Sequence, residues 1–220
     1  MAIRVKICGI NSVESADAAV RAGADFVGLM FHPRSPRMVN AEQARMLSDR
    51  MKGRARVVAV MVEPDDAALQ ATVANAKPDF IQLHGNESPT RVSAIRSVTG
   101  LPVIKVIAVS EPADLVAAAS YEAVADMLMF DAKAPANATR EGGHGTAFDW
   151  QMLNGRAFSR PWLLAGGLDA ENVSRAIAIS GAPGVDVSSG VETAPGQKSA
   201  EMIRAFIESV RNTNFASAQT

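Results

Sequence analysis

Short apolar runs rich in β-branched residues alternate with alanine-rich amphipathic stretches along almost the whole chain. Apolar runs of this kind are typical of strands buried on both faces, and their alternation with helices indicates a parallel sheet covered by helices. Eight such units in 220 residues fit a compact (β/α)8 TIM barrel, near the lower size limit of that fold. The eight predicted strands are 3–8, 26–31, 56–62, 80–84, 102–109, 125–131, 161–166 and 184–189.

An open doubly wound sheet is the alternative architecture for alternating strands and helices. Such a sheet usually has fewer strands and often carries a G-x-G-x-x-G turn after its first strand. Here the first predicted strand is followed by CGINS, which lacks that turn. We therefore predict an α/β fold with one barrel domain over residues 1–213 and a flexible tail over residues 214–220.

Helix start and stop signals lie between the predicted strands. Ser, Asn and Asp accept hydrogen bonds from the free N–H groups of a first helical turn, and glycine favours the left-handed conformation that ends a helix. Gly23 and Gly181 are placed to end two helices. The predicted starts are Asn11-Ser12, Asn40, Pro64-Asp65, Glu87-Ser88-Pro89, Asp169 and Ser199.

Charge and composition exclude several classes of function. With Lys+Arg 22 against Asp+Glu 23, the chain has no basic field to attract nucleic acid or an anionic membrane. One cysteine and three histidines exclude an internal disulfide and the usual zinc spacings. The chain shows no apolar leader and no apolar run of the roughly 18 residues that span a membrane. We expect a cytoplasmic protein with no nucleic-acid or membrane partner.

Barrels of this kind build their active sites at the carboxyl ends of the strands. The only cysteine, Cys8, closes the first predicted strand. A small buried hydrophobe would also explain it, as it does for most free cysteines. Its position favours a reactive thiol instead. The polar residues that close the strands are Cys8, residues 32–37, Glu63, His84, Asp131, Gly166, Gly167, Ser188 and Ser189.

Two turns rich in glycine and serine predict a phosphate site. AGGLD ends the seventh predicted strand and is expected to open a helix, while SSGVE ends the eighth. Backbone N–H groups and helix N-termini bind phosphate oxygens, and the loops after strands seven and eight form the usual phosphate site of barrels. The candidates are Gly166, Gly167, Ser188 and Ser189, although tight turns alone would also explain the glycines.

Seven motifs together resemble the phosphoribosylanthranilate isomerases of tryptophan biosynthesis. They are KICGI, GLMFHPRSPR, QLHGNE, MLMFDAK, GGHGTAFDW, LLAGGLDAENV and GVDVSSGVETAPGQKS, and they cover the chain from Lys6 to about Ser199. The resemblance implies an Amadori rearrangement of N-(5-phosphoribosyl)anthranilate to 1-(2-carboxyphenylamino)-1-deoxyribulose 5-phosphate. It implies no metal and no cofactor, a small phosphorylated aminosugar as the partner, and a monomer or a homodimer.

The resemblance also implies roles for single residues. Cys8 corresponds to the base and Asp131 to the acid, although Asp131 would also suit the cap of a loop. Arg37 corresponds to the ligand of the anthranilate carboxylate, which a guanidinium binds through two parallel hydrogen bonds. His84 is implied to line the substrate site, and we count Asp186 among the candidate substrate-binding residues.

The long segment 132–147 is expected to be a lid or a binding loop. The family usually reads GGTG where this chain has GGHG, so His144 departs from the pattern. Two other functions remain open. A histidine-pathway sugar-phosphate isomerase would use carboxylates at both catalytic positions, and Cys8 argues against it. A non-catalytic phosphate-binding barrel would need neither Cys8 nor Asp131.

Side-chain alternation predicts an ion pair beneath Cys8. Lys6 and Cys8 lie two residues apart and share one face of the first strand, as Asp186 and Ser188 do on the eighth. A closed barrel places these strands side by side, and a lysine inside it is costly unless it is paired. We predict a Lys6–Asp186 pair rather than a Lys6 that reaches bulk water. The positive potential of Lys6 is expected to lower the pKa of Cys8.

Overall fold

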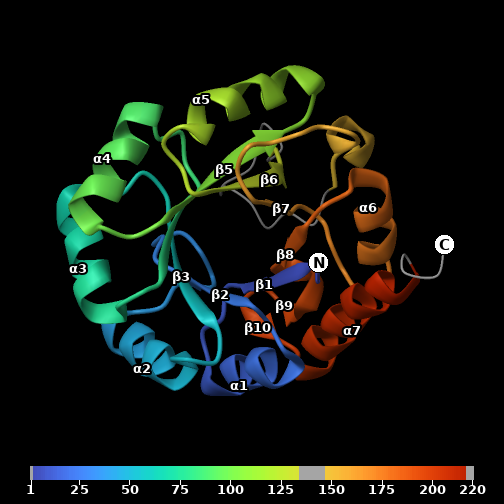
Figure 1. Cartoon of the computed structure of the whole chain (residues 1–220). Coiled ribbons are helices and arrows are strands. Elements are labelled where there is room, and N and C mark those ends of the chain that lie inside the picture. Colours follow the sequence, from blue (N-terminus) through green and yellow to red (C-terminus); the bar gives the residue numbers. More distant parts are fainter. Residues whose placement is uncertain (1, 134–146, 217–220) are drawn as a thin grey trace.

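Eight parallel strands close into a barrel in the computed structural model, which describes residues 2–133 and 147–216. Every strand pairs with its neighbour in the sequence, and β8 closes the ring against β1 (Figure 1). The predicted TIM barrel is therefore confirmed, and every predicted strand is present. The strands are β1 (Arg4–Cys8), β2 (Phe26–Met30), β3 (Arg56–Met61), β4 (Phe80–Leu83), β5 (Val103–Val109), β6 (Met127–Ala132), β7 (Trp162–Leu164) and β8 (Gly184–Val187).

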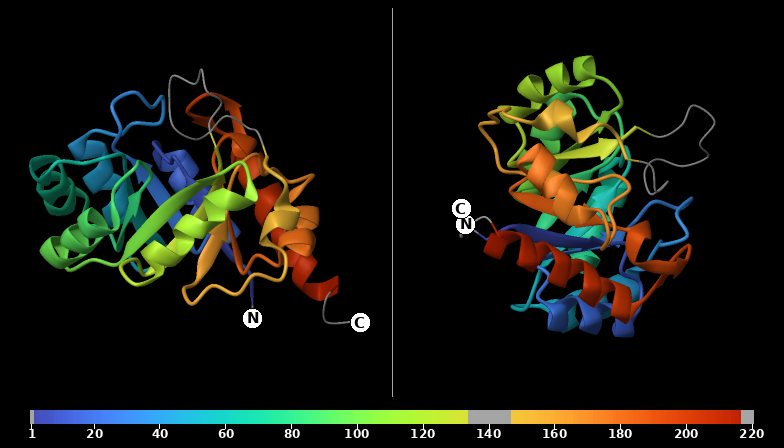
Figure 2. Two further views of the ribbon diagram at one scale, coloured as in Figure 1. Left: turned by 90° about the horizontal axis from the view of Figure 1, so that it is seen from above. Right: turned by 90° about the vertical axis from the view of Figure 1, so that its right-hand side faces the viewer.

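Helices surround the strands on the outside of the barrel (Figures 1 and 2). The last helix continues through Ala216, which takes it three residues into the segment 214–220 that was expected to be a tail. The helices are α1 (Val13–Ala22), α2 (Ala41–Met51), α3 (Asp66–Ala76), α4 (Pro89–Thr99), α5 (Ala118–Glu122), α6 (Val173–Ser180) and α7 (Ala200–Ala216).

Most of the predicted helix ends are confirmed. The side chains of Ser12, Asn40, Asp65 and Ser88 each accept a hydrogen bond from the first turn of their helix, and Ser199 accepts one from Met202 N. Gly23 and Gly181 adopt the left-handed conformation after α1 and α6. These short side chains stabilise helix starts because each satisfies an N–H group that has no partner within the helix.

The predicted start at Asp169 is wrong. The Oδ1 atom of Asp169 accepts hydrogen bonds from Glu171 N and Asn172 N, both at 2.9 Å, and so closes a turn. Helix α6 begins only at Val173. Aspartate stabilises local turns by the same hydrogen bonds that make it a helix cap, so the residue type alone does not separate the two.

Five short elements have no counterpart among the predicted strands and helix starts, namely helix α5, two 3-10 helices and the two strands of a hairpin. A 3-10 helix, η1 (Pro112–Ala117), precedes α5, and a second, η2 (Trp150–Leu153), follows β6. After β8 and the 3-10 turn η3 (Ser189–Val191), the chain forms a small antiparallel hairpin of β9 (Glu192–Ala194) and β10 (Gln197–Lys198). Strands of three and two residues are too short to produce a readable alternation.

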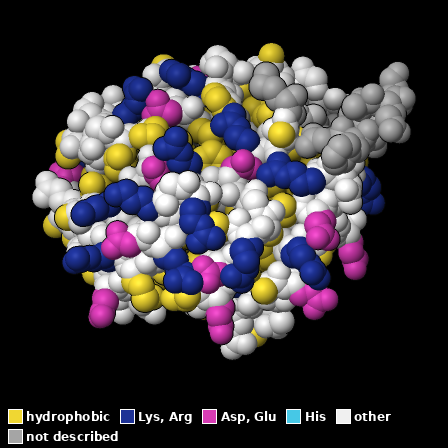
Figure 3. Space-filling model, turned by 60° about the horizontal axis from the view of Figure 1, so that its bottom comes forward, with side chains coloured by type: hydrophobic (Ala, Val, Ile, Leu, Met, Phe, Trp, Pro, Cys, Tyr) yellow, Lys and Arg dark blue, Asp and Glu magenta, His cyan; other side chains and the backbone are white. Residues whose placement is uncertain are grey.

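Charged side chains of both signs are interspersed on the face of the molecule that Figure 3 shows. Basic groups lie beside acidic ones there rather than in one basic field. Within the part of the chain that the structure describes, no helix combines the length and the apolar character that a membrane crossing requires.

Aspartates at the amino-terminal end of the barrel tie neighbouring strands together in pairs, β1 with β2, β3 with β4 and β5 with β6. Asp25, Asp79 and Asp126 each directly precede a strand and accept a hydrogen bond from the backbone N–H of the preceding strand. The three acceptor distances are 2.8, 2.8 and 2.9 Å, to Val5 N, Val57 N and Val103 N respectively. This repeated contact lies opposite the mouth where active sites form, so we expect it to affect stability rather than activity.

Replacing Asp79 with alanine is expected to lower the free energy of unfolding by about 1–3 kcal/mol, because Val57 N–H loses a charged acceptor in a part-buried place. The Tm is expected to fall by several degrees while kcat/KM stays unchanged. Thermal unfolding and steady-state assays check both. Asp49→Ala, at an exposed position on the same side of the molecule, is the control and should leave the Tm unchanged. An unchanged Tm in Asp79→Ala would show that the hydrogen bond from Val57 N to Asp79 does not stabilise the barrel.

Candidate active site

The strand ends bring the predicted catalytic residues to one mouth of the barrel. Cys8 is the last residue of β1, and Asp131 lies near the end of β6. Their side chains point into the barrel, because Cys8 packs in the interior cluster and Asp131 shares its face of β6 with Met127 and Met129 of that cluster. Both residues are nearly buried, with 6% and 8% of their surface exposed.

The predicted ion pair beneath Cys8 is confirmed. Lys6 lies opposite Asp186 in the β1–β8 register, and Lys6 Nζ donates to Asp186 Oδ1 at 2.8 Å. Lys6 is fully buried. Its burial favours the neutral amine, but Asp186 and Cys8 outweigh that effect and raise the pKa of Lys6. The pair thus keeps a charged group beneath the thiol.

Gly28 on β2 makes room for this arrangement. It lies opposite Cys8 in the register. A Cβ atom at this position would lie 2.9 Å from Cys8 Sγ and 3.1 Å from Lys6 Nζ. The absence of a side chain at position 28 therefore lets the thiol and the ammonium group lie together at the end of β1.

The predicted direction of the Cys8 pKa is wrong. Burial raises the pKa of the Cys8 thiol, and Asp186 raises it further, while Lys6 and Lys198 act in the opposite sense without overcoming the burial. Desolvation disfavours the thiolate, and the charge of Lys6 is largely balanced by its partner Asp186. The thiol of Cys8 therefore ionises at a higher pH than that of an ordinary cysteine. Once formed, its thiolate is the stronger base of the two.

Alkylation of Cys8 is expected to follow this direction. Because Cys8 is the only cysteine, iodoacetamide labelling reports on it alone. Labelling should be slow at neutral pH and should rise with a midpoint above that of a cysteine in an unstructured peptide, since the thiolate is the reactive form. Rates measured between pH 6 and 10, with a short cysteine peptide as the control, check this. A midpoint at or below that of the peptide would contradict the burial effect.

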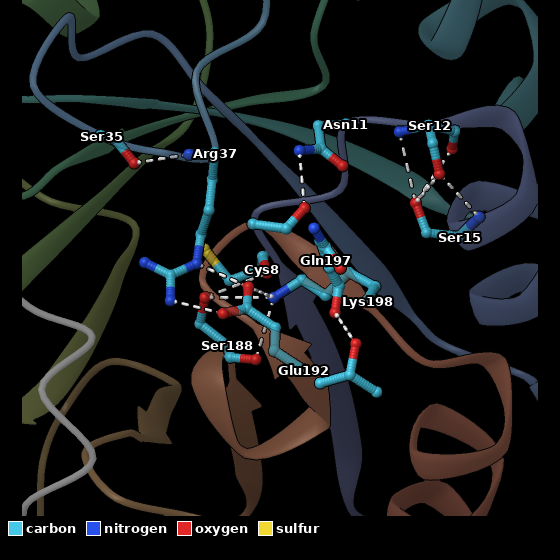
Figure 4. A network of polar contacts seen from close by, with 12 residues as sticks. Cys8, Asn11, Ser12, Ser15, Ser35, Arg37, Ser188, Glu192, Gln197 and Lys198 are labelled. Carbon is cyan, nitrogen blue, oxygen red and sulfur yellow. Dashed lines mark hydrogen bonds and ion pairs between the residues drawn. The ribbon is translucent and has the colours of Figure 1, made fainter.

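Arg37 is held by a carboxylate of the chain itself. Its side chain is nearly buried, and it donates from Nε to Glu192 Oε1 at 2.7 Å and from Nη2 to Glu192 Oε2 at 2.8 Å. Figure 4 shows its remaining guanidinium nitrogen pointing away from Glu192. The two-pronged contact fixes the plane of the guanidinium group, so its free edge has a defined direction.

Lys198 extends this contact to the end of β1. Its ammonium group donates to Glu192 Oε1 at 2.7 Å and to Ser188 O at 2.9 Å. Ser188 Oγ in turn donates to the carbonyl oxygen of Cys8 at 3.2 Å (Figure 4). Burial raises the pKa of Glu192, but Arg37 and Lys198 outweigh it and lower the pKa, so Glu192 stays ionised between two cations.

Glu192 and Lys198 were not among the residues predicted from the sequence. Both belong to the motif GVDVSSGVETAPGQKS, which resembles the family, but they were read only as part of that motif. The hairpin β9–β10 places them beside each other, and its register is Lys198 opposite Glu192. The sequence offered one signal for this pair: an acidic and a basic residue lie six positions apart with a glycine between them, which is compatible with a tight hairpin.

Asp131 is paired with a histidine. His84 follows β4 directly, and its Nε2 atom lies 3.2 Å from Asp131 Oδ2. On the other side of the ring, Nδ1 lies 3.2 Å from the amide nitrogen of the fully buried Gln82. With the amide N–H of Gln82 donating to Nδ1, the ring proton lies on Nε2, so His84 donates to Oδ2 of Asp131. His84 and Asp131 together line a cavity of about 510 Å³ at the mouth.

The two glycine turns adopt the conformations that a close backbone approach requires. Gly166 and Gly167 have φ of 88° and 63°, and a Cβ at Gly166 would lie 2.6 Å from Ala132 N. A Cβ at Gly190 would collide with the carbonyl of Leu168, so the turns after β7 and β8 pack directly against each other. Ser189 opens η3 beside them. The expectation that AGGLD opens a helix is wrong, since α6 begins later at Val173.

The predicted lid or binding loop over residues 132–147 lies mostly outside the described residues. Residues 134–146, which include His144, are not described.

Among the residues that the structure describes, no group of three or more His, Cys, Asp or Glu side chains is arranged to hold a metal ion.

A thiol and a histidine-paired carboxyl at the mouth of a (β/α)8 barrel, beside two glycine turns, define a barrel enzyme of the acid–base class. A profile of the family described as N-(5'phosphoribosyl)anthranilate (PRA) isomerase matches residues 5–209. The chain belongs to this family and is an isomerase of tryptophan biosynthesis. This result favours the isomerase over the two other functions left open by the sequence.

Relatives and solved structures agree with this assignment. The N-(5'-phosphoribosyl)anthranilate isomerase of Azorhizobium caulinodans is 54% identical over 99% of this chain and 95% of its own. That of Paramagnetospirillum magneticum is 51% identical over 96% of this chain and 98% of its own. The crystal structure of the enzyme from Thermotoga maritima is 34% identical, with a TM-score of 0.86, over 96% of this chain and 99% of its own.

Two further solved structures of this enzyme, the second of them from Thermotoga maritima, carry information on ligand and assembly. One is a complex with reduced 1-(o-carboxyphenylamino)-1-deoxyribulose 5-phosphate, at a TM-score of 0.83 and 33% identity over 96% of this chain and 99% of its own. The other shows mutually generated monomers of the dimeric enzyme, with the same score, identity and coverage.

Proposed function

We propose that Cys8 and Asp131 are the base and the acid with which this isomerase converts N-(5-phosphoribosyl)anthranilate to 1-(2-carboxyphenylamino)-1-deoxyribulose 5-phosphate. The observation that supports these roles is their placement. Strands β1 and β6 end at the same mouth, and each carries one inward titratable side chain at or next to its last residue, Cys8 on β1 and Asp131 on β6. An Amadori rearrangement needs one acid and one base on the sugar, and each contributes about 10²–10⁴ in rate.

Asp131 acts first by giving its proton to the furanose ring oxygen. The bond between C1 and the ring oxygen breaks, and the nitrogen lone pair forms the Schiff base at C1. The carboxylate that remains accepts the Nε2–H of His84 at 3.2 Å. Charge that develops on Asp131 therefore meets a donor that is already in place, which is how preorganised groups lower a barrier.

Cys8 acts second by removing the proton from C2 as a thiolate. The C2–H electron pair forms a C1=C2 double bond, the π bond between C1 and nitrogen breaks, and its electron pair goes to nitrogen to give an enolamine. The enolamine becomes the ketone when C1 is protonated and the C2 hydroxyl loses its proton. The Lys6 ammonium lies beside the thiol and favours its ionised form, although it does not outweigh the burial.

Arg37 is the proposed ligand of the anthranilate carboxylate. Glu192 occupies two of its nitrogens, so the substrate carboxylate would meet the edge of the guanidinium that points away from Glu192. The phosphate would lie on the turns around Gly166, Gly167, Ser188 and Ser189, whose backbone can approach it closely. His84 lines the mouth. Contact of Asp186 with substrate stays a prediction, since its Oδ1 pairs with Lys6.

Conversion of phosphoribosylanthranilate by the purified chain tests the proposal. The fluorescence of the anthranilate substrate should decay and the aminoketose should accumulate in equal amount, as measured by chromatography. Activity should survive dialysis against a chelator, because neither proposed step uses a metal or a cofactor. Loss of activity that returns on addition of a metal would overturn the cofactor-free mechanism.

Replacement of Arg37 with alanine is expected to raise KM at least about tenfold, because a buried charged hydrogen bond to a ligand contributes about 1.5–3 kcal/mol. Inhibition by free anthranilate should weaken in parallel. Lys198 remains to pair with Glu192, so the fold should persist. Arg34→Ala, in the same turn but exposed, is the control and should keep the wild-type KM. An unchanged KM in Arg37→Ala would place the carboxylate elsewhere.

The assembly and the location of the protein are also proposals. We expect a monomer or a homodimer, and light scattering during gel filtration distinguishes the two by mass. We expect the protein in the cytoplasm with the small phosphorylated aminosugar as its partner. Cell fractionation with an antibody against the chain checks the location.

A further inference from the structure

Lys105 on β5 is a buried cation that the proposed chemistry does not use. It has 2% of its surface exposed, and its ammonium group has three acceptors. These are Glu87 Oε2 at 2.7 Å, Gly85 O at 2.5 Å and, more weakly, Leu83 O at 3.4 Å. An ammonium group has three N–H donors, so all three are used at the last residue of β4 and in the turn that follows it.

Glu87 completes a network at this turn. Its side chain is 1% exposed, and the oxygen that does not face Lys105 accepts from Glu63 N at 2.8 Å and Gly85 N at 3.1 Å. Glu63 follows β3, so Glu87 ties the turns after β3 and β4 to the lysine on β5. A Cβ at Gly85 would lie 2.6 Å from Glu63 Cγ and 2.9 Å from Glu87 Oε1, which shows how closely the groups pack.

His84 lies between the two carbonyl groups that Lys105 holds. Leu83 and Gly85 flank it in the chain, and Lys105 donates to both. The backbone of His84 is therefore fixed from its outer side. Its ring meets Gln82 on one side and Asp131 on the other. The direction of the Nε2–H bond to Asp131 depends on the backbone position that Lys105 and Glu87 set.

A buried ion pair is a poor source of stability, because desolvation of two charges offsets most of their attraction. The attraction between the two charges therefore does not explain why they are buried here. We propose that the Lys105–Glu87 ion pair is a positioning device that holds His84 against Asp131, and so orients the acid. This inference rests on the role proposed above for Asp131.

The double variant Lys105→Met with Glu87→Gln tests the proposal. It removes both charges together, while the glutamine oxygen can still accept from Glu63 N and Gly85 N. We expect kcat to fall by about 10–10²-fold with KM within about twofold, since a displacement of about 1 Å near the reacting groups has that effect. The single variant Glu87→Gln, which keeps the lysine and its carbonyl contacts, should lose less. If the double variant does not fold, the single variant Glu87→Gln takes its place as the test.

The matched control is the ion pair of Arg50 and Asp17, which lies at the surface between α2 and α1. Arg50→Met with Asp17→Asn removes the same number of charges far from the mouth. This variant should keep the wild-type kcat. An equal loss of kcat in both double variants would overturn the proposal, because the loss would then follow from removing an ion pair anywhere.

A coupling experiment separates positioning from general damage. His84→Asn removes the ring that the pair is proposed to hold. In that background the double variant should lower kcat by less than about twofold, since the two changes act through one contact. If the double variant lowers kcat by the same factor in the His84→Asn background as in wild type, the proposal is overturned. Lys105→Arg, which keeps a charged donor, should restore part of the activity that Lys105→Met loses.

Nuclear magnetic resonance of the histidine ring provides a readout independent of turnover. The chain has three histidines, and the His84 signal is the one that disappears in His84→Asn. With ¹⁵N-labelled histidine, wild type should show a fixed ring with the proton on Nε2, and the double variant should show tautomer averaging. An unchanged His84 signal overturns the proposal. Because this result needs no substrate, it stands even if the proposed acid role of Asp131 fails.

Discussion

Replacement of Cys8 with serine is expected to lower kcat by about 10²–10⁴-fold, the contribution of a general base, with only a small change in KM. A hydroxyl is a much weaker acid than a thiol, so serine at neutral pH supplies no anion to remove the C2 proton. The contacts of the main chain persist in the variant, because Ser188 bonds to the carbonyl of residue 8 and not to its side chain. Steady-state kinetics on both variant and wild type measure the change.

The pH dependence of kcat/KM gives a second test of Cys8 as the base. Burial raises the pKa of Cys8, so the thiolate fraction increases as the pH rises through and above neutrality. In wild type kcat/KM should rise with pH over this range, and the rise should be absent in Cys8→Ser. Cys8→Ala is the control and should be as slow as the serine variant. Wild-type turnover in Cys8→Ser would return Cys8 to the role of a small buried hydrophobe.

Strand number, closure and the Lys6–Asp186 pair were predictable because each depends on local, repeating features of the chain. Two-residue alternation places Lys6 and Cys8 on one face of β1, and closure of the barrel places Asp186 beside them. The same reasoning predicts the strand ends that carry Cys8 and Asp131. None of these steps needs knowledge of how distant side chains pack.

The contacts that hold the candidate site depend on such packing and were not predicted. Glu192 reaches Arg37 across 155 positions of the chain, and Lys105 reaches Glu87 across 18. The prediction that Lys6 lowers the pKa of Cys8 was wrong for a related reason. The sequence places Lys6 near Cys8, but the balance between that charge and desolvation depends on how deeply the thiol is buried.

Replacement of Asp131 with asparagine is expected to lower kcat by a similar factor of about 10²–10⁴, with KM nearly unchanged. Asparagine has the shape of the acid, and its carbonyl oxygen can accept the Nε2–H of His84 as the carboxylate does. It has no acidic proton for the ring oxygen. Ring opening should therefore become rate-limiting, while the thiolate of Cys8 remains able to remove the C2 proton.

A substrate that carries deuterium at C2 separates the two halves of the reaction. Removal of the C2 proton by Cys8 breaks this bond, whereas ring opening does not. The isotope effect on kcat should therefore be close to one in Asp131→Asn, where ring opening limits the rate, and large in Cys8→Ser, where proton removal limits it. Asp114→Asn, which changes another aspartate of the same cavity wall, is the control and should keep the wild-type kcat. Wild-type turnover in Asp131→Asn would exclude Asp131 as the acid, because the variant keeps the shape and the contact with His84 and lacks only the proton.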